Sequence, residues 1–376
     1  MASGDGNGLR TVHLEGFNAA HFGYGNMFLS LDRHLPNGVE NNPLSEVRIS
    51  CMQPDMVKGW YKGQKRVVFT MWETSVLPDS FADPLAQFDQ IVVPCVHNLE
   101  LFSRYHKTVT MVHLGIDPTV WKFSPAPKND VFRFVAGGSS WQRKGLDLVV
   151  RAFERLELPD AELVLKVAET AKGEPPIISH PCIKVIDKWL TLQEEYDLYA
   201  SADCFVAASR GEGFGLMPLQ TIAMGIPTIM SDMTGHSDFI NLASTSVPAY
   251  PKPADHNTFW NRGDWYEVTI DDLCEAMLHE YQQGAGRRDK EKAASAAKMT
   301  WRKSSAALIK ATGTGGLLGG KVWQPADEPT VLVTANRRVI ADIGRHAIRM
   351  EKGETKLVSH NVRDILLGAG YLQEDN

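Results

Sequence analysis

The sequence lacks several patterns that are typical of other protein classes. Its five cysteines, at positions 51, 95, 182, 204 and 274, have neither the paired spacing of a zinc site nor that of a disulfide scaffold. No apolar run reaches membrane-spanning length, and residues 1–8 do not place a cationic stretch before an apolar one. The net charge of -6 disfavours binding to duplex DNA, because its phosphates require clustered Lys and Arg. We therefore expect reduced thiols, a cytoplasmic location, no integral membrane segment and no stable nucleic-acid binding.

Short metal-binding patterns are also missing. The chain has twelve histidines but no His-x-His or His-x-x-x-His spacing, and Asp-x-Asp does not occur. Such groups are common ligands of divalent metals. We therefore predict no metal site and no cofactor.

Segment 204–232 is the most informative part of what is present. Its pattern predicts a buried strand, a glycine-broken loop, a short apolar helix and a second buried strand. The loop 211–215 carries one carboxylate, Glu212, and the helix has one long polar side chain, Gln220. Free backbone N–H groups at a helix start bind anions, and glycines let the anion approach. The segment thus suits a ligand with a phosphate and hydroxyls, and an ordinary strand–helix–strand unit is the alternative.

A second glycine turn lies between a predicted strand at 131–138 and an amphipathic helix at 146–156. Arg143 and Lys144 lie in this turn. Two cations suit a diphosphate, whose charge exceeds what backbone amides neutralise. Lys144 taken alone would also fit a solvated lysine at a helix start.

Two upstream loops follow predicted strands. Gly23-Tyr24-Gly25 lies between a strand at 11–15 and a helix through 27–35, where open α/β sheets bind ligands, although Gly-x-Gly by itself is typical of a tight turn. Trp72 and Glu73 follow a strand at 67–71. Rings stack on sugars and carboxylates accept hydrogen bonds from hydroxyls, so this pair favours sugar recognition, with loop capping by Glu73 as the alternative.

These segments together resemble the retaining GT-B glycosyltransferases of family 4. Residues 212–220 are similar to the motif E-G-F-G-L-x-x-x-E, with Gln220 in place of the second Glu. Residues 138–145 are similar to G-R-x-x-x-x-K-G, with Lys144 matching and Ser139 at the Arg position. Further similarities are found at W-E-T-x-x-L-P (72–78), V-V-P-S-x-x-N (92–98, with Cys in place of Ser), V-x-x-G-V-D (112–117) and G-H-x-D (235–238).

The resemblance implies an α/β fold of the GT-B type, with two Rossmann-like domains facing a central cleft and a small C-terminal appendage. The prolines after position 117 favour a hinge, and the glycines at 313–320 favour a linker. Residues 270–310 look helical, and the family sends one helix back across the first domain. We expect an N-terminal acceptor-side domain at 1–123, a nucleotide-sugar domain at 124–310, a linker at 311–328 and a small module at 329–376.

The resemblance also implies roles for individual residues. Glu212 would contact the transferred sugar, Arg143 and Lys144 the diphosphate, and Gln220 the ribose through its amide. His236 and Asp238 lie in the G-H-x-D segment on the donor side, and both could equally cap a helix. The expected catalytic residues are Glu212, Lys144, Arg143 and Glu73. The expected donor-binding residues are Gly23, Gly25, Ser139, Arg143, Lys144, Glu212, Gly213, Phe214, Gly215, Leu216, Gln220 and His236. The expected acceptor-side residues are Tyr24, Trp72, Glu73 and His97.

The implied activity is metal-independent transfer of a sugar from a UDP- or GDP-linked donor to a hydroxyl of a protein or glycan. The configuration at the anomeric carbon is retained, and the departing phosphate takes up the proton of the acceptor.

The pattern of residues 329–376 predicts two short strands and a terminal helix at 361–367, and these residues resemble small modules of tailed-phage structural proteins. This resemblance favours a phage gene, action in the host cytoplasm and a virion protein as the acceptor. The alternative is that residues 329–376 are a stabilising appendage. Gln220 and Ser139 motivate a competing hypothesis, an inactive GT-B scaffold. A sugar-nucleotide epimerase is a third.

Overall fold

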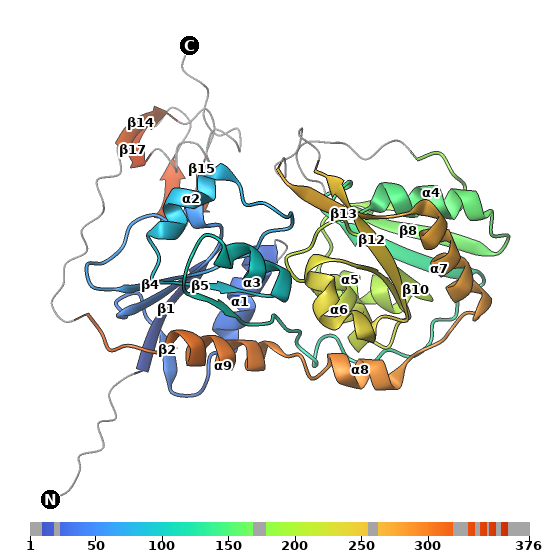
Figure 1. Ribbon diagram of the computed structural model, residues 1–376, viewed down its shortest axis with the longest axis horizontal. Coiled ribbons are helices and arrows are strands. Elements are labelled where there is room, and N and C mark those ends of the chain that lie inside the picture. The colour runs from blue at the N-terminus through green and yellow to red at the C-terminus, as the bar shows by residue number, and fades with distance from the viewer. Residues whose placement is uncertain are drawn as a thin grey trace, which may run out of the picture.

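The computed structural model describes residues 10–18, 23–167, 178–254 and 262–318, together with the backbone of four strands between 330 and 359. Two α/β domains, each built on its own sheet, lie side by side (Figure 1). This arrangement confirms the expectation of two Rossmann-like domains. Within the described ranges, no helix has both the length and the apolarity to cross a bilayer.

The first domain has a six-stranded parallel sheet in the order β2-β1-β3-β4-β5-β6. Strands β3 and β5 are buried along their whole length, as expected for a parallel sheet that is covered on both faces. Its elements are β1 (Arg10–Gly16), α1 (Gly23–Arg33), β2 (Val39–Asn41), β3 (Val47–Cys51), η1 (Pro54–Met56), β4 (Lys65–Phe69), α2 (Asp79–Ala86), β5 (Gln90–Val93), α3 (Val96–Ser103) and β6 (Val109–Met111).

The second domain has a seven-stranded sheet in the order β13-β12-β11-β10-β7-β8-β9, parallel except at β13. Strands β7 and β10 are direct neighbours, so the loops at their carboxyl ends meet at one edge. Its elements are β7 (Phe132–Gly138), α4 (Leu146–Leu156), β8 (Ala161–Val167), β9 (Ile183–Asp187), α5 (Leu192–Ala200), β10 (Cys204–Ala207), α6 (Leu216–Ala223), β11 (Thr228–Asp232), η2 (Thr234–Leu242), β12 (Thr245–Pro253), β13 (Asp264–Val268), α7 (Ile270–Gln282) and α8 (Lys290–Ala296).

The last described helix, α9 (Trp301–Thr312), returns to the first domain and lies along its lower side in Figure 1. The Ser305 hydroxyl donates to the Leu31 carbonyl of α1 at 3.1 Å, and Lys65 Nζ donates to the Thr312 carbonyl at 2.7 Å. Residues 270–310 are helical as expected, and turns divide them into α7, α8 and α9. Thr269, Asp289 and Thr300 cap the three N-termini with their side chains, which sets each start.

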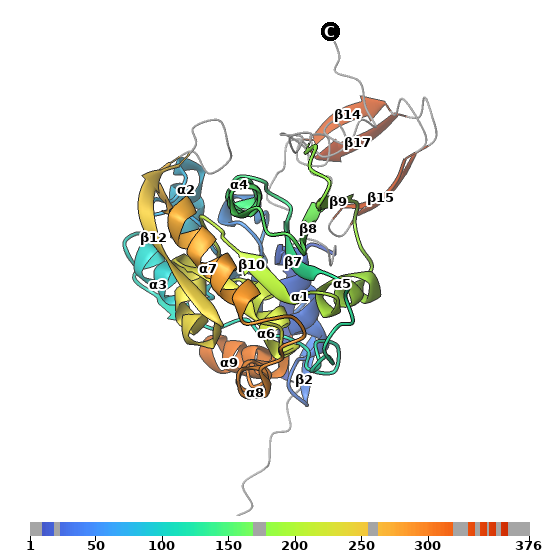
Figure 2. The same cartoon turned by 90° about the vertical axis from the view of Figure 1, so that its right-hand side faces the viewer.

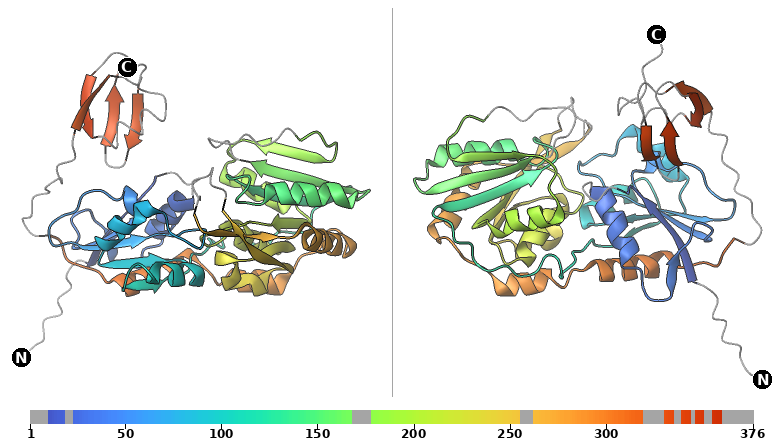
Figure 3. Two further views of the ribbon diagram at one scale, coloured as in Figure 1. Left: turned by 45° about the horizontal axis from the view of Figure 1, so that its top comes forward. Right: turned by 180° about the vertical axis from the view of Figure 1, so that it is seen from behind.

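Four strands are described after residue 329: β14 (Thr330–Thr334), β15 (Val339–Ile343), β16 (His346–Met350) and β17 (Thr355–Ser359). They form two antiparallel pairs, β14 with β17 and β15 with β16. Figures 2 and 3 show these strands beyond one side of the first domain, away from the main body. Both expected strands are present, while the expected helix at 361–367 lies outside the described residues.

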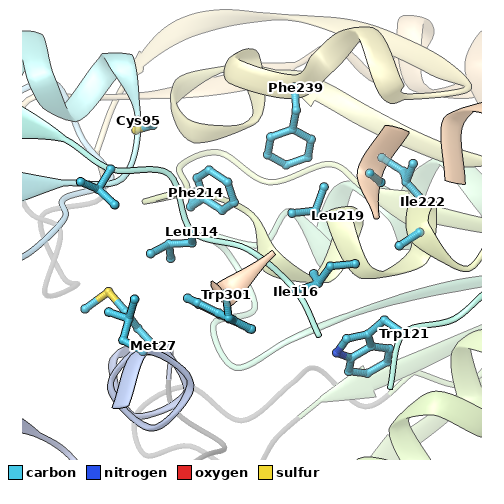
Figure 4. Packing of buried hydrophobic residues seen from close by; sticks show 14 of the residues in the cluster. Met27, Cys95, Leu114, Ile116, Trp121, Phe214, Leu219, Ile222, Phe239 and Trp301 are labelled. Carbon is cyan, nitrogen blue, oxygen red and sulfur yellow. The ribbon is translucent and has the colours of Figure 1, made fainter. Parts of the chain in front are cut away.

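One hydrophobic cluster continues from the first domain into the second. Figure 4 shows Met27 and Leu114 of the first domain on one side and Phe214 and Phe239 of the second on the other, with Trp301 of α9 close by. The shared apolar burial stabilises contact between the domains. It also fixes how the loops of the two domains face each other.

Candidate functional site

The site is built from two turns of the second domain, one after β7 and one after β10. Gly145 has a φ of +65°, and a Cβ there would lie 1.9 Å from the Ala208 carbonyl oxygen. Glycine is therefore required both for the left-handed backbone and for the close approach of the turns. This contact brings the cations of the first turn to the carboxylate of the second.

Three charged side chains converge at this point. Lys144 Nζ lies 2.5 Å from Glu212 Oε1, and the Arg143 guanidinium lies 3.5 Å from Glu212 Oε2. Arg143 also donates to the Gly211 carbonyl at 2.7 Å, and the Ser209 hydroxyl donates to Glu212 at 2.8 Å. The three charged side chains are no more than about a tenth exposed. Arg143, Lys144 and Glu212 thus form a nearly buried cluster with one excess positive charge.

The pKa values in the cluster follow from this charge balance. Burial alone would raise the pKa of Glu212, but attraction to Lys144 and Arg143 lowers it to about 2. The pKa of Lys144 is also lowered, because burial of its ammonium and repulsion by Arg143 outweigh attraction to Glu212. The two cations both lower the pKa of the carboxylate, whereas burial dominates at the lysine. An added phosphate would therefore stabilise the lysine charge.

His236 lies against the same loop. It is fully buried, its Nδ1 lies 3.1 Å from the Ser231 carbonyl oxygen, and its Nε2 has no hydrogen-bond partner among the described residues. Burial lowers its pKa to about 4, so the ring is neutral at pH 7. A Cβ at Gly215, whose φ is +107°, would lie 2.5 Å from this ring. Gly215 therefore allows His236 to pack beside Glu212.

The other donor-side residues of the second domain differ in burial. The Phe214 ring is buried against Phe239 and His113, with centroids 5.4 and 5.9 Å apart. Leu216 begins helix α6 and is partly buried, while Gln220 is buried about one turn further on. Phe214 therefore anchors the loop in the core, and the loop backbone is held by Arg143 at the Gly211 carbonyl and by the Thr234 hydroxyl at the Glu212 N–H.

The loop after β4 brings the first domain to this cluster. A Cβ at Gly211 would lie 2.3 Å from the Glu73 carbonyl oxygen, and one at Gly213 would lie 2.3 Å from Met71 Sδ. The Glu73 carboxylate is close enough to Lys144 to favour its charged form. The structure thus brings Glu73 together with Arg143, Lys144 and Glu212.

The expected acceptor-side residues hold this loop in place. The Tyr24 hydroxyl bonds to the backbone N and O of Met71 at 3.1 and 3.0 Å, and burial raises its pKa. His97 Nε2 lies 3.2 Å from the Thr74 carbonyl oxygen, and its ring contacts Tyr266 of the second domain. Tyr24 and His97 therefore link the loop to its surroundings.

Trp72 is not placed as the sequence predicted. Its ring is 2% exposed and packs edge-on against Phe81, and its indole N–H donates to Thr74 and to the Val76 carbonyl. A face covered by core side chains cannot stack on a sugar. The expectation that Trp72 contacts the acceptor is therefore wrong for this conformation, because the hydrophobic core takes up the ring.

Three candidates remain, and two of them lie in helix α1, where a turn was expected. Ser139 is exposed at the end of β7, Gly23 is exposed at the start of α1, and Gly25 is buried in the same helix. A Cβ at Gly23 would meet no atom within 4 Å, so this glycine borders open space. The role of all three at the diphosphate stays a prediction.

Sequence reasoning missed one residue that organises the site, Arg210, and the contact that another, Asp238, makes with the opposite domain. Arg210 directly precedes the Gly211–Gly215 loop and is buried. Its position beside a glycine loop was the sequence signal that could have identified it. Asp238 accepts hydrogen bonds from Val96 N at 3.1 and 3.2 Å and lies 2.8 Å from His113 Nε2. It therefore caps helix α3 of the opposite domain, and only the capping alternative in the sequence had hinted at this.

Two other features lie outside this cluster. A cavity of about 200 Å³ in the first domain is lined by Pro54, Asp55, Val57, Lys58, Gly59, Trp60, Pro84 and Gln87, none of them a predicted site residue. Among the residues that the structure describes, no group of three or more His, Cys, Asp or Glu is arranged to hold a metal ion.

The fold and these paired turns define the class of protein: two Rossmann-like domains of the GT-B type. A crystal structure of WaaG, a glycosyltransferase involved in lipopolysaccharide biosynthesis, superimposes with a TM-score of 0.53 over 81% of this chain and 99% of that one, at 13% identity. Residues 130–255 match the family described as glycosyl transferases group 1. This match covers part of the second domain, and Arg143, Lys144 and Glu212 lie within it.

Two curated relatives match shorter parts of this chain. "Putative glycosyltransferase 41" of Sulfolobus islandicus filamentous virus (isolate Iceland/Hveragerdi) is 23% identical over 42% of this chain and 44% of its own length. The lipopolysaccharide core biosynthesis mannosyltransferase LpsB of Rhizobium meliloti (strain 1021) is 43% identical over 12% of each chain. The chain thus spans less than half the length of these relatives.

Proposed function

We propose that this protein is a retaining glycosyltransferase that moves a sugar from a nucleotide-diphosphate sugar to an acceptor hydroxyl. The observation that carries the proposal is the pairing of Lys144 with Glu212 at 2.5 Å, with Arg143 beside them, at the edge where two parallel strands end. The glycosyl transferases group 1 match over the same residues supports it.

Each charged group has a proposed role. Arg143 and Lys144 bind the diphosphate, whose negative charge balances the excess positive charge of the cluster. Once Lys144 turns to the phosphate, Glu212 is free to accept hydrogen bonds from sugar hydroxyls. Because Glu212 has a pKa of about 2, it is an acceptor throughout the physiological range. Gln220 would bond a ribose hydroxyl through its amide.

The proposed chemical step uses the departing phosphate as the base. Arg143 and Lys144 stabilise the charge that develops on the leaving diphosphate, and that phosphate takes the proton of the acceptor hydroxyl as the new glycosidic bond forms on the same face. Glu73 belongs to the opposite domain and touches Gly211, so it is the residue we place at the acceptor side. Closure of the domains excludes water and limits donor hydrolysis.

The test is a transfer and donor-hydrolysis assay with a panel of nucleotide sugars. The panel includes UDP- and GDP-linked hexoses, among them a mannosyl donor because one relative is named a mannosyltransferase. Intact-mass measurement of candidate acceptors, virion proteins included, identifies the product. We expect Glu212→Gln to lower turnover at least 100-fold, as for loss of a directly contacting group. The matched control is Glu162→Gln, another carboxylate paired with a lysine at 2.5 Å but remote from the cluster.

The assay also separates the two competing functions. Full turnover by Glu212→Gln would remove this carboxylate from the mechanism. A wild-type protein that binds nucleotide sugars but converts none would favour the inactive scaffold, which Gln220 and Ser139 motivate. Isomerised donor in the absence of any acceptor would favour an epimerase.

A further inference from the structure

Arg210 is a buried cation that borders the Glu212 loop and that the proposed chemistry does not use. Its side chain is 6% exposed. The guanidinium donates to both oxygens of Asp147 at 2.7 Å, and its Nε donates to Glu267 at 2.6 Å. It also donates to the Gln142 carbonyl. These bonds use a large share of the five N–H donors of the guanidinium.

The partners of Arg210 come from three different segments. Gln142 directly precedes Arg143 and Lys144, Asp147 lies in the first turn of α4, and Glu267 lies on β13. The backbone of Arg210 follows the same pattern, since its N–H donates to the Arg143 carbonyl at 2.7 Å and its carbonyl accepts from Tyr266 N at 2.9 Å. Arg210 thus fastens the cation turn, the Glu212 loop and β13 to one another.

This geometry controls where Glu212 lies. Arg210 and Glu212 are two residues apart in one loop, and Lys144 is two residues from Gln142 in the other. A bidentate arginine–carboxylate pair fixes both the distance and the angle between the segments that it joins. Loss of the pair would let the two turns separate, although the residues that contact a donor would all remain.

Strand β13 extends the connection to the other domain. Asp264, the first residue of β13, donates its backbone N–H to the Ser75 hydroxyl at 2.8 Å and accepts from Ser75 N at 3.1 Å. Ser75 lies two residues after Glu73. The strand that Arg210 holds through Glu267 therefore also holds the loop that places Glu73 against Gly211.

We propose that Arg210 is a positioning residue that aligns the Arg143–Lys144 turn with Glu212 and, through Glu267 and β13, with the Glu73 loop. It touches no substrate in this role. The activity part of the inference rests on the proposed glycosyltransferase function. The alignment of the two turns by Arg210 also predicts that loss of Arg210 weakens nucleotide binding, and this effect can be measured without any turnover.

The experiment compares Arg210→Lys with Arg133→Lys. Arg133 lies in the same domain and pairs with Glu162 at 2.6 Å, but its partners are remote from the Glu212 loop. Lysine keeps the charge and loses the fork geometry in both variants. Glu267→Gln is the milder second variant should Arg210→Lys fold poorly. Measurements are kcat and KM for the donor, the affinity for UDP and GDP by calorimetry, and the denaturation midpoint.

We expect Arg210→Lys to lower kcat at least 30-fold and nucleoside diphosphate affinity at least 5-fold, in keeping with the cost of misplaced groups in an active site. We expect Glu267→Gln to lower kcat about 5-fold and Arg133→Lys to stay within 2-fold on both measures, by the same reasoning. A purely structural role predicts lower denaturation midpoints for both arginine variants with kcat and affinity unchanged, and that result would overturn the proposal.

The two proposals fail in different ways. A wild-type protein that transfers no sugar refutes the proposed function, and nucleotide affinity then decides the role of Arg210. A wild-type protein that also binds neither UDP nor GDP refutes both.

Discussion

Replacement of Lys144 by Met tests whether burial makes the Lys144–Glu212 pair strong. The pKa of Glu212 is about 2, against 4.5 ordinarily, and this difference corresponds to about 3 kcal/mol. Loss of one partner of a buried pair costs an amount in this range, because the other charge stays buried. Arg143 stays beside Glu212 in the variant and supplies part of this difference. We therefore expect Lys144→Met to lower the free energy of unfolding by up to about 3 kcal/mol at pH 7.

Lys184→Met is the matched control. Lys184 Nζ lies 2.5 Å from Glu162 Oε2, the same distance as in the buried pair, but its side chain is 61% exposed. Glu162 also keeps an arginine, Arg133, as Glu212 keeps Arg143. Glu162 is as buried as Glu212, so the two pairs differ in the exposure of the lysine. Because solvent screens the exposed ammonium of Lys184, we expect the control to cost less than about 1 kcal/mol. Distance and chemistry are equal in the two pairs, so the difference measures burial.

The pH dependence has a definite sign. A carboxyl group whose pKa is lowered in the folded protein contributes stability above its unfolded pKa of 4.5, and this contribution is lost as the pH falls towards 2. The gap between wild type and Lys144→Met should thus be constant above about pH 5 and fall to about half near pH 3. Urea denaturation at several pH values measures it. Equal losses in Lys144→Met and Lys184→Met would refute the reasoning.

Three further predictions concern the contact between domains and the state of the histidine. Gly211→Ala places a methyl group against the Glu73 carbonyl and should lower the free energy of unfolding by at least about 1 kcal/mol. The control Gly23→Ala, whose methyl group meets open space, should not lower it. Equal denaturation midpoints for the two variants would contradict the contact between Gly211 and Glu73. Asp238→Ala removes the cap of α3, should cost about 1 kcal/mol and should increase the radius of gyration in small-angle scattering. His236 has a pKa of about 4, so His236→Gln should leave the shape of the rate profile unchanged between about pH 5.5 and 8, and loss of a titration step there would contradict a neutral ring.

Local patterns were enough to predict the turns that carry the chemistry. The helix expected at 146–156 is α4, and the expected strand, glycine loop and helix around Glu212 are β10, the 211–215 loop and α6. These features depend on hydrophobic periodicity and on the backbone freedom of glycine, which act over a few residues. The same signals do not tell which distant side chain meets another.

Trp72 and Arg210 illustrate what the sequence could not show. A tryptophan beside a glutamate is compatible with both a sugar platform and a core residue, and the packing of Phe81 against the ring decided for the core. The importance of Arg210 depends on Asp147 and Glu267, which are 63 and 57 residues away along the chain. Such pairings exist only once the strand order is set.

The sequence by itself determined the strands and helices that flank the site, the two glycine turns and the presence of two cations and one carboxylate in them, because these properties are local. The tertiary structure decided that β7 and β10 are neighbours, that Lys144 reaches Glu212, and that α9 and β13 join the two domains. Those contacts connect residues far apart in the chain. Their formation depends on sheet topology and on apolar burial across the whole molecule, not on any short segment.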